Sequence, residues 1–224
     1  MTIMFFSKKV AMKRDFLRKL VLGFSLVAGL GLAVHAHAED EAPDALIKRL
    51  STEVLDAIKS DKAIRAGDMG KVVALVDGHI LPNLNFQRMT ASAVGPAWRQ
   101  ASPDQQKKLQ DEFKILLVRT YAGALAQVTD QTISMKPLRA AAEDKEVIVR
   151  TEVKGSGDPI QLDYRLEKTP GQGAGWKIYN INVLGVWLVE NYKSQFAAEI
   201  NAKGLDGLIT TLVERNKANA KKSS

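Results

Sequence analysis

The sequence predicts an α+β protein in which a four-stranded, curved antiparallel sheet forms a meander and several helices pack on one of its faces. Two observations support this prediction. Before residue 130 and after residue 185, apolar residues recur every three to four positions, as in amphipathic helices. Between these stretches, apolar and polar residues alternate over short segments, as in strands with one buried face. Helices, then strands, then helices is an order typical of α+β domains.

The first half of the chain supplies most of the helices. An amphipathic helix is expected over 42–60, a shorter one begins near Asp68, and another follows Asn85. The clearest helix start is Ser102, because a proline occupies the first helical position and Gln105 stands three residues after the cap. The periodic apolar positions that follow predict a helix extending to about residue 128.

The strands are expected in the segments that alternate with period two: 131–135, 147–154, 160–167 and 176–183. The last of these is irregular. Trp176 and Ile178 share one parity, whereas Ile181 and Val183 share the other. Either a β-bulge redirects this strand or both of its faces are covered.

Two further helices are expected to close the chain, one from near Gly185 and one after Gly204. No internal repeat interrupts this order. We therefore expect a single domain over 39–216, followed by a polar, disordered tail over 217–224.

The N-terminus holds most of the positive charge. The whole chain has a net charge of +7, but residues 1–19 alone carry +5. They precede an uncharged apolar run over 20–34 and the small-residue sequence Ala36-His37-Ala38. This pattern predicts a signal peptide over 1–38, cleaved after Ala38, and a periplasmic location; an uncleaved membrane anchor is the alternative. Without these residues the net charge is +2, so a nucleic-acid partner is not expected.

Catalytic and metal-binding residues are scarce. The chain has no cysteine, which excludes disulfides, thiolate metal sites and thiol nucleophiles, and His79 is the only histidine after residue 38. His79 stands at a helix end, where a surface or capping role is expected. The glycine-rich segment 171–175 joins two strands and opens no helix, so it does not resemble a phosphate-binding loop. Asp163 and Glu167 fall on the polar parity of a strand, and we expect them to be solvated rather than catalytic. No enzymatic activity and no cofactor are predicted.

Two longer stretches carry a family signal. The first is NFQRMTASAVGPAWRQAS over 85–102, with Phe113 and Arg119-Thr-Tyr-Ala in the next helix; the second is WKIYNINVLGVWLVENYKSQF over 176–196. Together they resemble the MlaC family of periplasmic phospholipid-binding proteins, also called toluene-tolerance proteins. The chain departs from the family at Asn85 and Asn180, where acidic residues are usual. No role that depends on those two carboxylates is expected here.

The resemblance implies a carrier whose cargo is a diacyl phospholipid. Such a carrier exchanges lipid between an outer-membrane lipoprotein complex containing a porin and an inner-membrane ABC transporter, and so maintains outer-membrane lipid asymmetry. Two acyl tails with roughly 30 methylenes cost on the order of 20 kcal/mol in water, so they require an apolar cavity. We expect that cavity between the sheet and the helices, with these lining residues: Trp98, Phe113, Leu117, Tyr121, Val147, Val149, Leu162, Tyr164, Ile181, Val183, Val186 and Tyr192.

Two alternatives remain open from the sequence. A small α+β cone enzyme acting on an apolar substrate would need a buried carboxylate, or His79, directed into the cavity. A purely structural envelope protein would have a solid core and no cavity.

Overall fold

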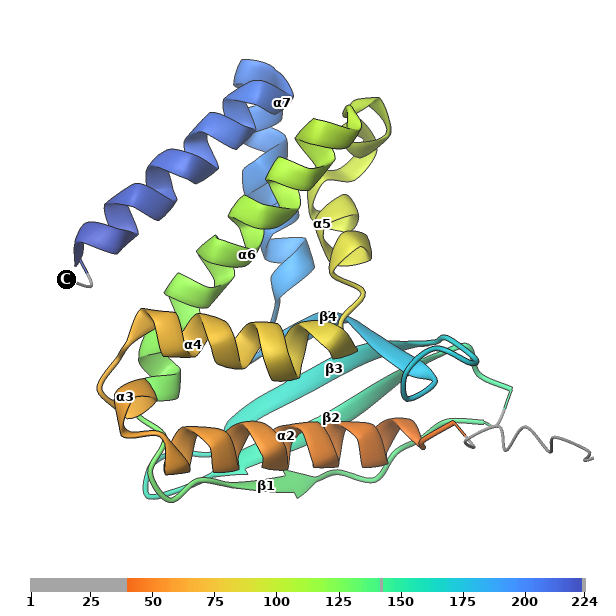
Figure 1. Ribbon diagram of the computed structural model, residues 1–224. Coiled ribbons are helices and arrows are strands. Elements are labelled where there is room, and N and C mark those ends of the chain that lie inside the picture. The colour runs from red at the N-terminus through yellow and green to blue at the C-terminus, as the bar shows by residue number, and fades with distance from the viewer. Residues whose placement is uncertain (1–39, 142, 223–224) are drawn as a thin grey trace, which may run out of the picture. The chain divides into compact units, whose positions relative to one another are not determined.

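The computed structural model describes residues 40–141 and 143–222 (Figure 1). The predicted signal peptide over 1–38 lies outside the described residues. Six α-helices are described, together with three short helical segments of π or 3-10 type: α2 Pro43–Ser60, α3 Lys62–Arg65, α4 Met69–Leu75, η1 Val76–Ile80, η2 Leu81–Asn83, α5 Phe86–Val94, η3 Gly95–Gln100, α6 Pro103–Ala126 and α7 Leu188–Lys222. Within the described part of the chain, no helix is long and apolar enough to cross a membrane.

The predicted helix starts are confirmed by their caps. The Ser102 hydroxyl accepts a hydrogen bond from the backbone N–H of Gln105, and the Gln105 side chain accepts one from the backbone N–H of Ser102, which completes the capping box of α6. Asp68 caps α4 and Asn85 caps α5 in the same manner, each through a side-chain oxygen.

The last helix is interrupted where the sequence predicts a boundary. Gly204 has φ 69° and ψ −172°, a conformation that favours glycine, and it divides α7 into two helical halves. The second half extends to Lys222. The assignment of 217–224 as a disordered tail stays a prediction.

The sheet is an antiparallel meander in the order β1-β2-β3-β4-β5, with one strand more than the sequence predicts: β1 Thr132–Met135, β2 Glu146–Lys154, β3 Ile160–Lys168, β4 Trp176–Val183 and β5 Val186–Trp187. The prediction of four strands is therefore wrong by one. The two residues of β5 are too few to show an alternating pattern, and they were assigned to the start of the last helices.

The irregularity of β4 is a bulge. Arg165 pairs with Asn180, whereas its neighbour Leu166 pairs with Ile178, so Tyr179 is the extra residue on β4. This confirms the first of the two explanations that the sequence left open. Beyond the bulge, Ile181 and Val183 return to the same face as Ile178.

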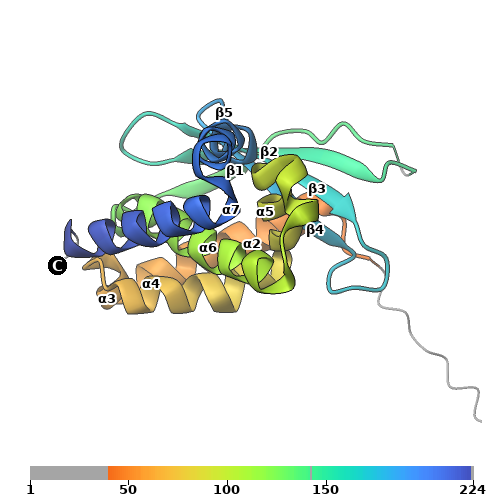
Figure 2. The same cartoon turned by 90° about the horizontal axis from the view of Figure 1, so that it is seen from above.

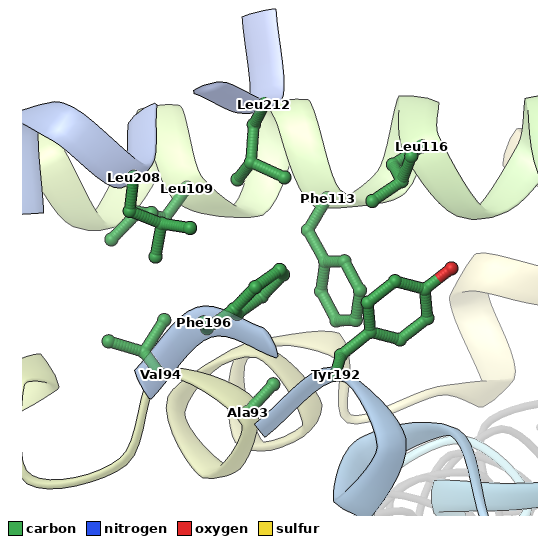
Figure 3. Close-up of a cluster of buried hydrophobic side chains, with 9 residues drawn as sticks. All are labelled: Ala93, Val94, Leu109, Phe113, Leu116, Tyr192, Phe196, Leu208 and Leu212. Atoms are coloured by element: carbon green, nitrogen blue, oxygen red, sulfur yellow. The ribbon is translucent and has the colours of Figure 1, made fainter. Parts of the chain in front are cut away.

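In the described part of the chain, buried apolar side chains form three clusters. Helix α2 packs on one face of the sheet, here called the inner face (Figure 1). The sheet cluster joins α2 to this face and consists of Leu46, Ile47, Leu50, Val147, Val149, Leu166, Trp176 and Ile178. The helical cluster lies among α5, α6 and α7 and consists of Ala93, Val94, Leu109, Phe113, Leu116, Tyr192, Phe196, Leu208 and Leu212 (Figure 3). The third cluster joins the end of α2 to α3, α4 and α6: Ile58, Ile64, Val72, Leu75, Val118, Ala122 and Val128.

Candidate functional site

The inner face of the sheet is apolar across three strands. Val149 pairs with Tyr164, and Tyr164 pairs with Ile181. Directly opposed residues in an antiparallel sheet point to the same face, so these side chains form one row. Helix α2 covers this part of the sheet, and Val149 is 1% exposed as a result.

Toward the β4–β5 turn, apolar side chains on the same face become exposed. The next row begins at the buried Thr151, which pairs with Leu162. Its apolar part is Leu162, Val183 and Val186, which pair in that order, and Ile160 pairs with Val153 beside them. We call the five apolar residues the apolar strip: Val153, Ile160, Leu162, Val183 and Val186. Ile160 is 40% exposed and Val186 50%, and the other three are half-buried. Contiguous exposed apolar surface of this kind is typical of a binding site.

The β4–β5 turn ends the strip with a strained leucine. Leu184 and Gly185 form a two-residue turn with φ values of 52° and 89°, and Leu184 is 64% exposed. Left-handed backbone costs a branched side chain free energy that glycine or asparagine avoids. The turn thus holds an exposed leucine where hairpin chemistry favours another residue.

The twelve lining residues predicted from the sequence fall into three groups. Val147, Val149, Tyr164 and Ile181 lie in or against the sheet cluster, and Leu162, Val183 and Val186 lie in the apolar strip. Trp98, Phe113, Leu117 and Tyr192 lie in or against the helical cluster, with Tyr121 half-buried close to Tyr192. The expected cavity among them is not shown, and their contact with a ligand stays a prediction.

The aromatic residues of the helical cluster pack around Phe113. Its ring packs edge to face against Tyr192 and Phe196 (Figure 3), with centroid distances of 5.0 Å and 5.2 Å. The ring centroid of Phe86 lies 5.8 Å away. Burial raises the pKa of the Tyr192 phenol and also that of Tyr164 on the sheet. These phenols are therefore neutral at physiological pH, and the apolar clusters contain no ionised phenol.

The opposite face of the sheet, the outer face, is polar, and ion pairs between side chains attach the start of α5 to it. Arg88 pairs with Glu146 at 2.7 Å and also with Glu167, and its guanidinium lies 3.6 Å from the ring centroid of Tyr179. Asn85 donates to Glu167 at 2.6 Å. Hydrogen bonding to Arg88 is the main reason that the pKa of Glu146 is lowered. We call this group the α5 joint.

A second polar group attaches the start of α7 to the same outer face. The Asn180 side-chain oxygen accepts hydrogen bonds from the backbone N–H groups of Ile181 and Val189, and its amide donates to Glu190 at 2.6 Å. Arg165 also pairs with Glu190 and lies over the ring of Trp187. Burial opposes ionisation of Glu190, yet the hydrogen bonds from Asn180 and Arg165 leave its pKa lowered. This group is the α7 joint.

The two joints give the amides of Asn85 and Asn180 a role that a carboxylate could not fill. An aspartate in place of Asn85 would set a carboxylate against Glu167, and one in place of Asn180 would set a carboxylate against Glu190. Each amide instead donates a hydrogen bond to its glutamate, which a carboxylate cannot do. The sequence alone did not show that Asn85 meets Glu167 or that Asn180 meets Glu190.

Two acidic residues were placed wrongly by alternation. Asp163 and Glu167 were expected on a solvated face, but Asp163 is only 7% exposed and accepts hydrogen bonds from Gln161, while Glu167 belongs to the α5 joint. Alternation separates the two faces of the sheet but does not show that helices cover the polar one. His79 is exposed in η1, as expected. The described residues contain no group of three or more acidic, histidine or cysteine side chains that could hold a metal ion.

A groove occurs elsewhere, between α4 and α6. Its volume is about 410 Å³, and it is lined by Met69, Val73, Asp111, Lys114, Ile115, Val118 and Arg119. None of the twelve predicted residues lines it. No sequence signal distinguished its apolar residues from an ordinary helix–helix contact.

Comparisons with known proteins agree on one family. The family model described as "MlaC protein" matches residues 48–214. The chain is 22% identical over 194 residues to the intermembrane phospholipid transport system binding protein MlaC of Haemophilus influenzae, covering 86% of this chain and 89% of that protein. It is 24% identical over 168 residues to toluene tolerance protein ttg2D of Pseudomonas putida, covering 74% and 76%.

A solved structure is similar over most of the fold. It is a phospholipid-binding protein from Ralstonia solanacearum, determined in complex with a phospholipid. The two chains share 49% sequence identity and superpose with a TM-score of 0.76, which covers 79% of this chain and 98% of the other.

Proposed function

The chain belongs to the MlaC family, and from this premise we propose that it is a periplasmic carrier that binds a diacyl phospholipid and moves it between the two membranes. The observation that carries the proposal is the 49% identity to a protein solved with a phospholipid, across 98% of that protein's length. The family and these relatives point to a lipid-binding carrier and not to an enzyme.

We place the acyl tails against the inner face of the sheet, starting at the apolar strip. The strip offers exposed apolar surface that continues directly into the sheet cluster through the row of Tyr164 and Ile181. Charged groups that could oppose this placement lie on the outer face, where the two joints hold them in hydrogen bonds. The tails would extend from the strip toward the helical cluster, and the hydrated head group would stay at the surface.

Energetics require release into a second apolar site. Two tails of roughly 30 methylenes bring on the order of 20 kcal/mol of hydrophobic free energy, so loss into water is negligible. Transfer through a docked partner costs only the difference between the free energies with which the two apolar sites bind the lipid. We propose that the partners are the outer-membrane lipoprotein complex with its porin and the inner-membrane ABC transporter, and that any energy for directed transfer comes from the transporter.

Native mass spectrometry of protein purified from the periplasm without detergent tests the binding. We expect a polypeptide that carries one phospholipid mass, which tandem fragmentation identifies by its head group and acyl chains. A bare polypeptide mass under gentle conditions would refute the proposal. The same measurement on material exported from cells also gives the mass of the mature N-terminus, and so tests cleavage after Ala38.

A matched pair of edge-strand variants tests the location of the tails. Val186→Asp places a charge in the apolar strip on β5, whereas Thr132→Asp places one at an exposed position of β1, the other edge strand. Val186→Asp should lower phospholipid occupancy at least severalfold, and Thr132→Asp should leave it unchanged. Equal occupancy in the two variants would contradict the placement at the strip while leaving the binding itself intact.

Transfer between partners needs its own assay. Protein loaded with a fluorescent phospholipid should pass that lipid to proteoliposomes containing the ABC transporter faster than to protein-free liposomes. Equal rates would rule out the transporter as a partner.

A further inference from the structure

Arg119 on α6 has a buried hydrogen-bond donor without an acceptor. Its side chain is half-buried, and its Nε atom is inaccessible to solvent and makes no hydrogen bond within residues 40–141 and 143–222. No ion pair to Arg119 is found among those residues either. Burying a charged donor without a partner costs free energy that native proteins usually avoid. An acceptor supplied by a ligand would satisfy this donor.

Arg119 lies in the groove between α4 and α6, whose walls are apolar. Met69 and Val73 come from α4, and Ile115 and Val118 come from α6. These α6 residues lie on a different face of the helix from Phe113, which belongs to the helical cluster. The groove is thus a separate surface from the apolar strip on the sheet.

The other charges in the groove are already balanced. Lys114 Nζ pairs with Asp77 Oδ1 at 3.0 Å, and Asp111 Oδ2 pairs with Lys107 Nζ at 2.6 Å. Of the charged residues lining the groove, Arg119 alone lacks a partner within the described part of the chain. An entering ligand therefore meets apolar walls and one uncompensated positive charge.

We propose that this groove binds a single-chain anionic amphiphile, whose head-group oxygen accepts a hydrogen bond from Arg119 Nε while its acyl chain lies against the apolar walls. The size of the groove supports one chain. A volume of about 410 Å³ is at the lower end of the range for small-ligand sites. A methylene occupies about as much space as a water molecule, about 30 Å³, so the roughly 30 methylenes of a diacyl lipid do not fit. This site does not depend on the proposed carrier function.

Calorimetric titration of the purified protein with dodecyl phosphate tests the proposal. Arg119→Gln should weaken binding by about tenfold or more, because a charge-assisted hydrogen bond in a partly buried site is lost. Arg119→Lys keeps the charge and should retain part of the affinity. Arg99→Gln, which changes an exposed arginine in η3, is the matched control and should bind as the wild type does.

Two further probes separate the head group from the chain. Monolauroyl glycerol has a similar chain without the charge, and its weaker binding should be the same in wild type and Arg119→Gln. Inorganic phosphate has the charge without the chain and should bind at least tenfold more weakly than dodecyl phosphate. The proposal is overturned if Arg119→Gln binds dodecyl phosphate as tightly as wild type, or if inorganic phosphate binds equally well.

Stability and competition complete the test. Because Nε has no partner to lose, Arg119→Gln without ligand should be at least as stable as wild type. A lower unfolding midpoint would reveal a structural contact and refute the proposal. Protein already loaded with a diacyl phospholipid should still bind dodecyl phosphate. Displacement of the phospholipid would instead show one shared site, which contradicts a separate groove but leaves the carrier function standing.

Discussion

The two faces of the sheet differ in chemistry and in how completely they are covered. On the outer face, Asp163, Asn180 and Asn182 are buried polar residues, and Asn180 meets α7 through hydrogen bonds. Ion pairs of Arg88 and Arg165 attach α5 and α7 to the same face. The inner face is mainly apolar, and α2 packs on the part that forms the sheet cluster, whereas Ile160 and Val186 are exposed. Seen from above, α4 and α6 lie side by side next to the sheet (Figure 2). Directional bonds determine where α5 and α7 attach, whereas the non-directional inner surface can accept a flexible apolar ligand.

This contrast suggests that the two faces of the sheet have different roles, one in stability and the other in binding. Polar joints specify a single arrangement because each donor has few suitable acceptors, and an unsatisfied partner is costly. An apolar surface accepts many acyl chains at similar free energy, which suits a carrier whose cargo varies in chain length. The outer face should therefore govern stability, and the uncovered inner face should govern binding.

The largest effect on stability is expected at the α7 joint. Asn180→Leu removes two accepted backbone hydrogen bonds and the donation to Glu190, at a residue that is 2% exposed. At about 1 kcal/mol for each bond, the free energy of unfolding should fall by about 3 kcal/mol, measured by urea denaturation. Asn180→Asp is the control. It keeps the acceptor, so its loss should be smaller at pH 4 than at pH 7, where two carboxylates face each other. An Asn180→Leu protein as stable as wild type would contradict the role of this joint.

A smaller effect compares two valines on the inner face. Val149→Ala creates a cavity beneath α2 and should lower the free energy of unfolding by about 2 kcal/mol, because Val149 is 1% exposed. Val186→Ala, at 50% exposure, should change it by less than about 0.5 kcal/mol. The stabilisation that added phospholipid gives should fall in Val186→Ala relative to wild type, as measured by the shift in melting temperature. Equal losses of stability in the two variants would show that the strip is covered in solution.

These valines also show what the sequence can and cannot predict. Alternation identified β2, β3 and β4 and placed Val149 and Val183 on apolar faces, because that signal is local. Alternation did not cover Val186, which was assigned to the start of a helix. It also could not show that Val149 is buried, since that burial depends on where α2 lies. Helix starts such as Ser102 were predicted for the same local reason.

Long-range pairs were beyond reach of the sequence. Arg88 and Glu146 are 58 residues apart, and the sequence around either residue does not indicate the other as its partner. Strand β5 was not predicted, because two residues are too few to show an alternating pattern. The sequence thus predicted the candidate lining residues as a set of residue types on apolar faces and not as a set of contacts, and their contact with a ligand stays a prediction.

The α5 joint should give a moderate, pH-dependent effect. Arg88→Gln removes the pairs with Glu146 and Glu167 and should cost about 1.5 kcal/mol at pH 7, discounted for partial exposure. The pKa of Glu146 is lowered from 4.5, chiefly by its hydrogen bond to Arg88. A lowered pKa stabilises the fold above pH 4.5, and that contribution is lost as the pH falls through the folded-state value. The difference between wild type and Arg88→Gln should therefore shrink between pH 5 and pH 3 in urea titrations. A difference that grows toward low pH would contradict this assignment.

The smallest effect is a gain in stability at the β4–β5 turn, where the apolar strip ends. Leu184→Asn, followed by Gly185, creates the asparagine–glycine pair that suits a two-residue turn with both φ values positive, so the free energy of unfolding should rise by about 0.5–1 kcal/mol. Leu184→Ala keeps the backbone strain and should show no gain. If the turn served folding alone, asparagine would be the better residue. A leucine that is 64% exposed at the end of the strip is therefore consistent with a role in contact rather than in folding. Should Leu184→Asn prove less stable than wild type, the leucine packs on the strip, and the uncovered inner face is smaller than described.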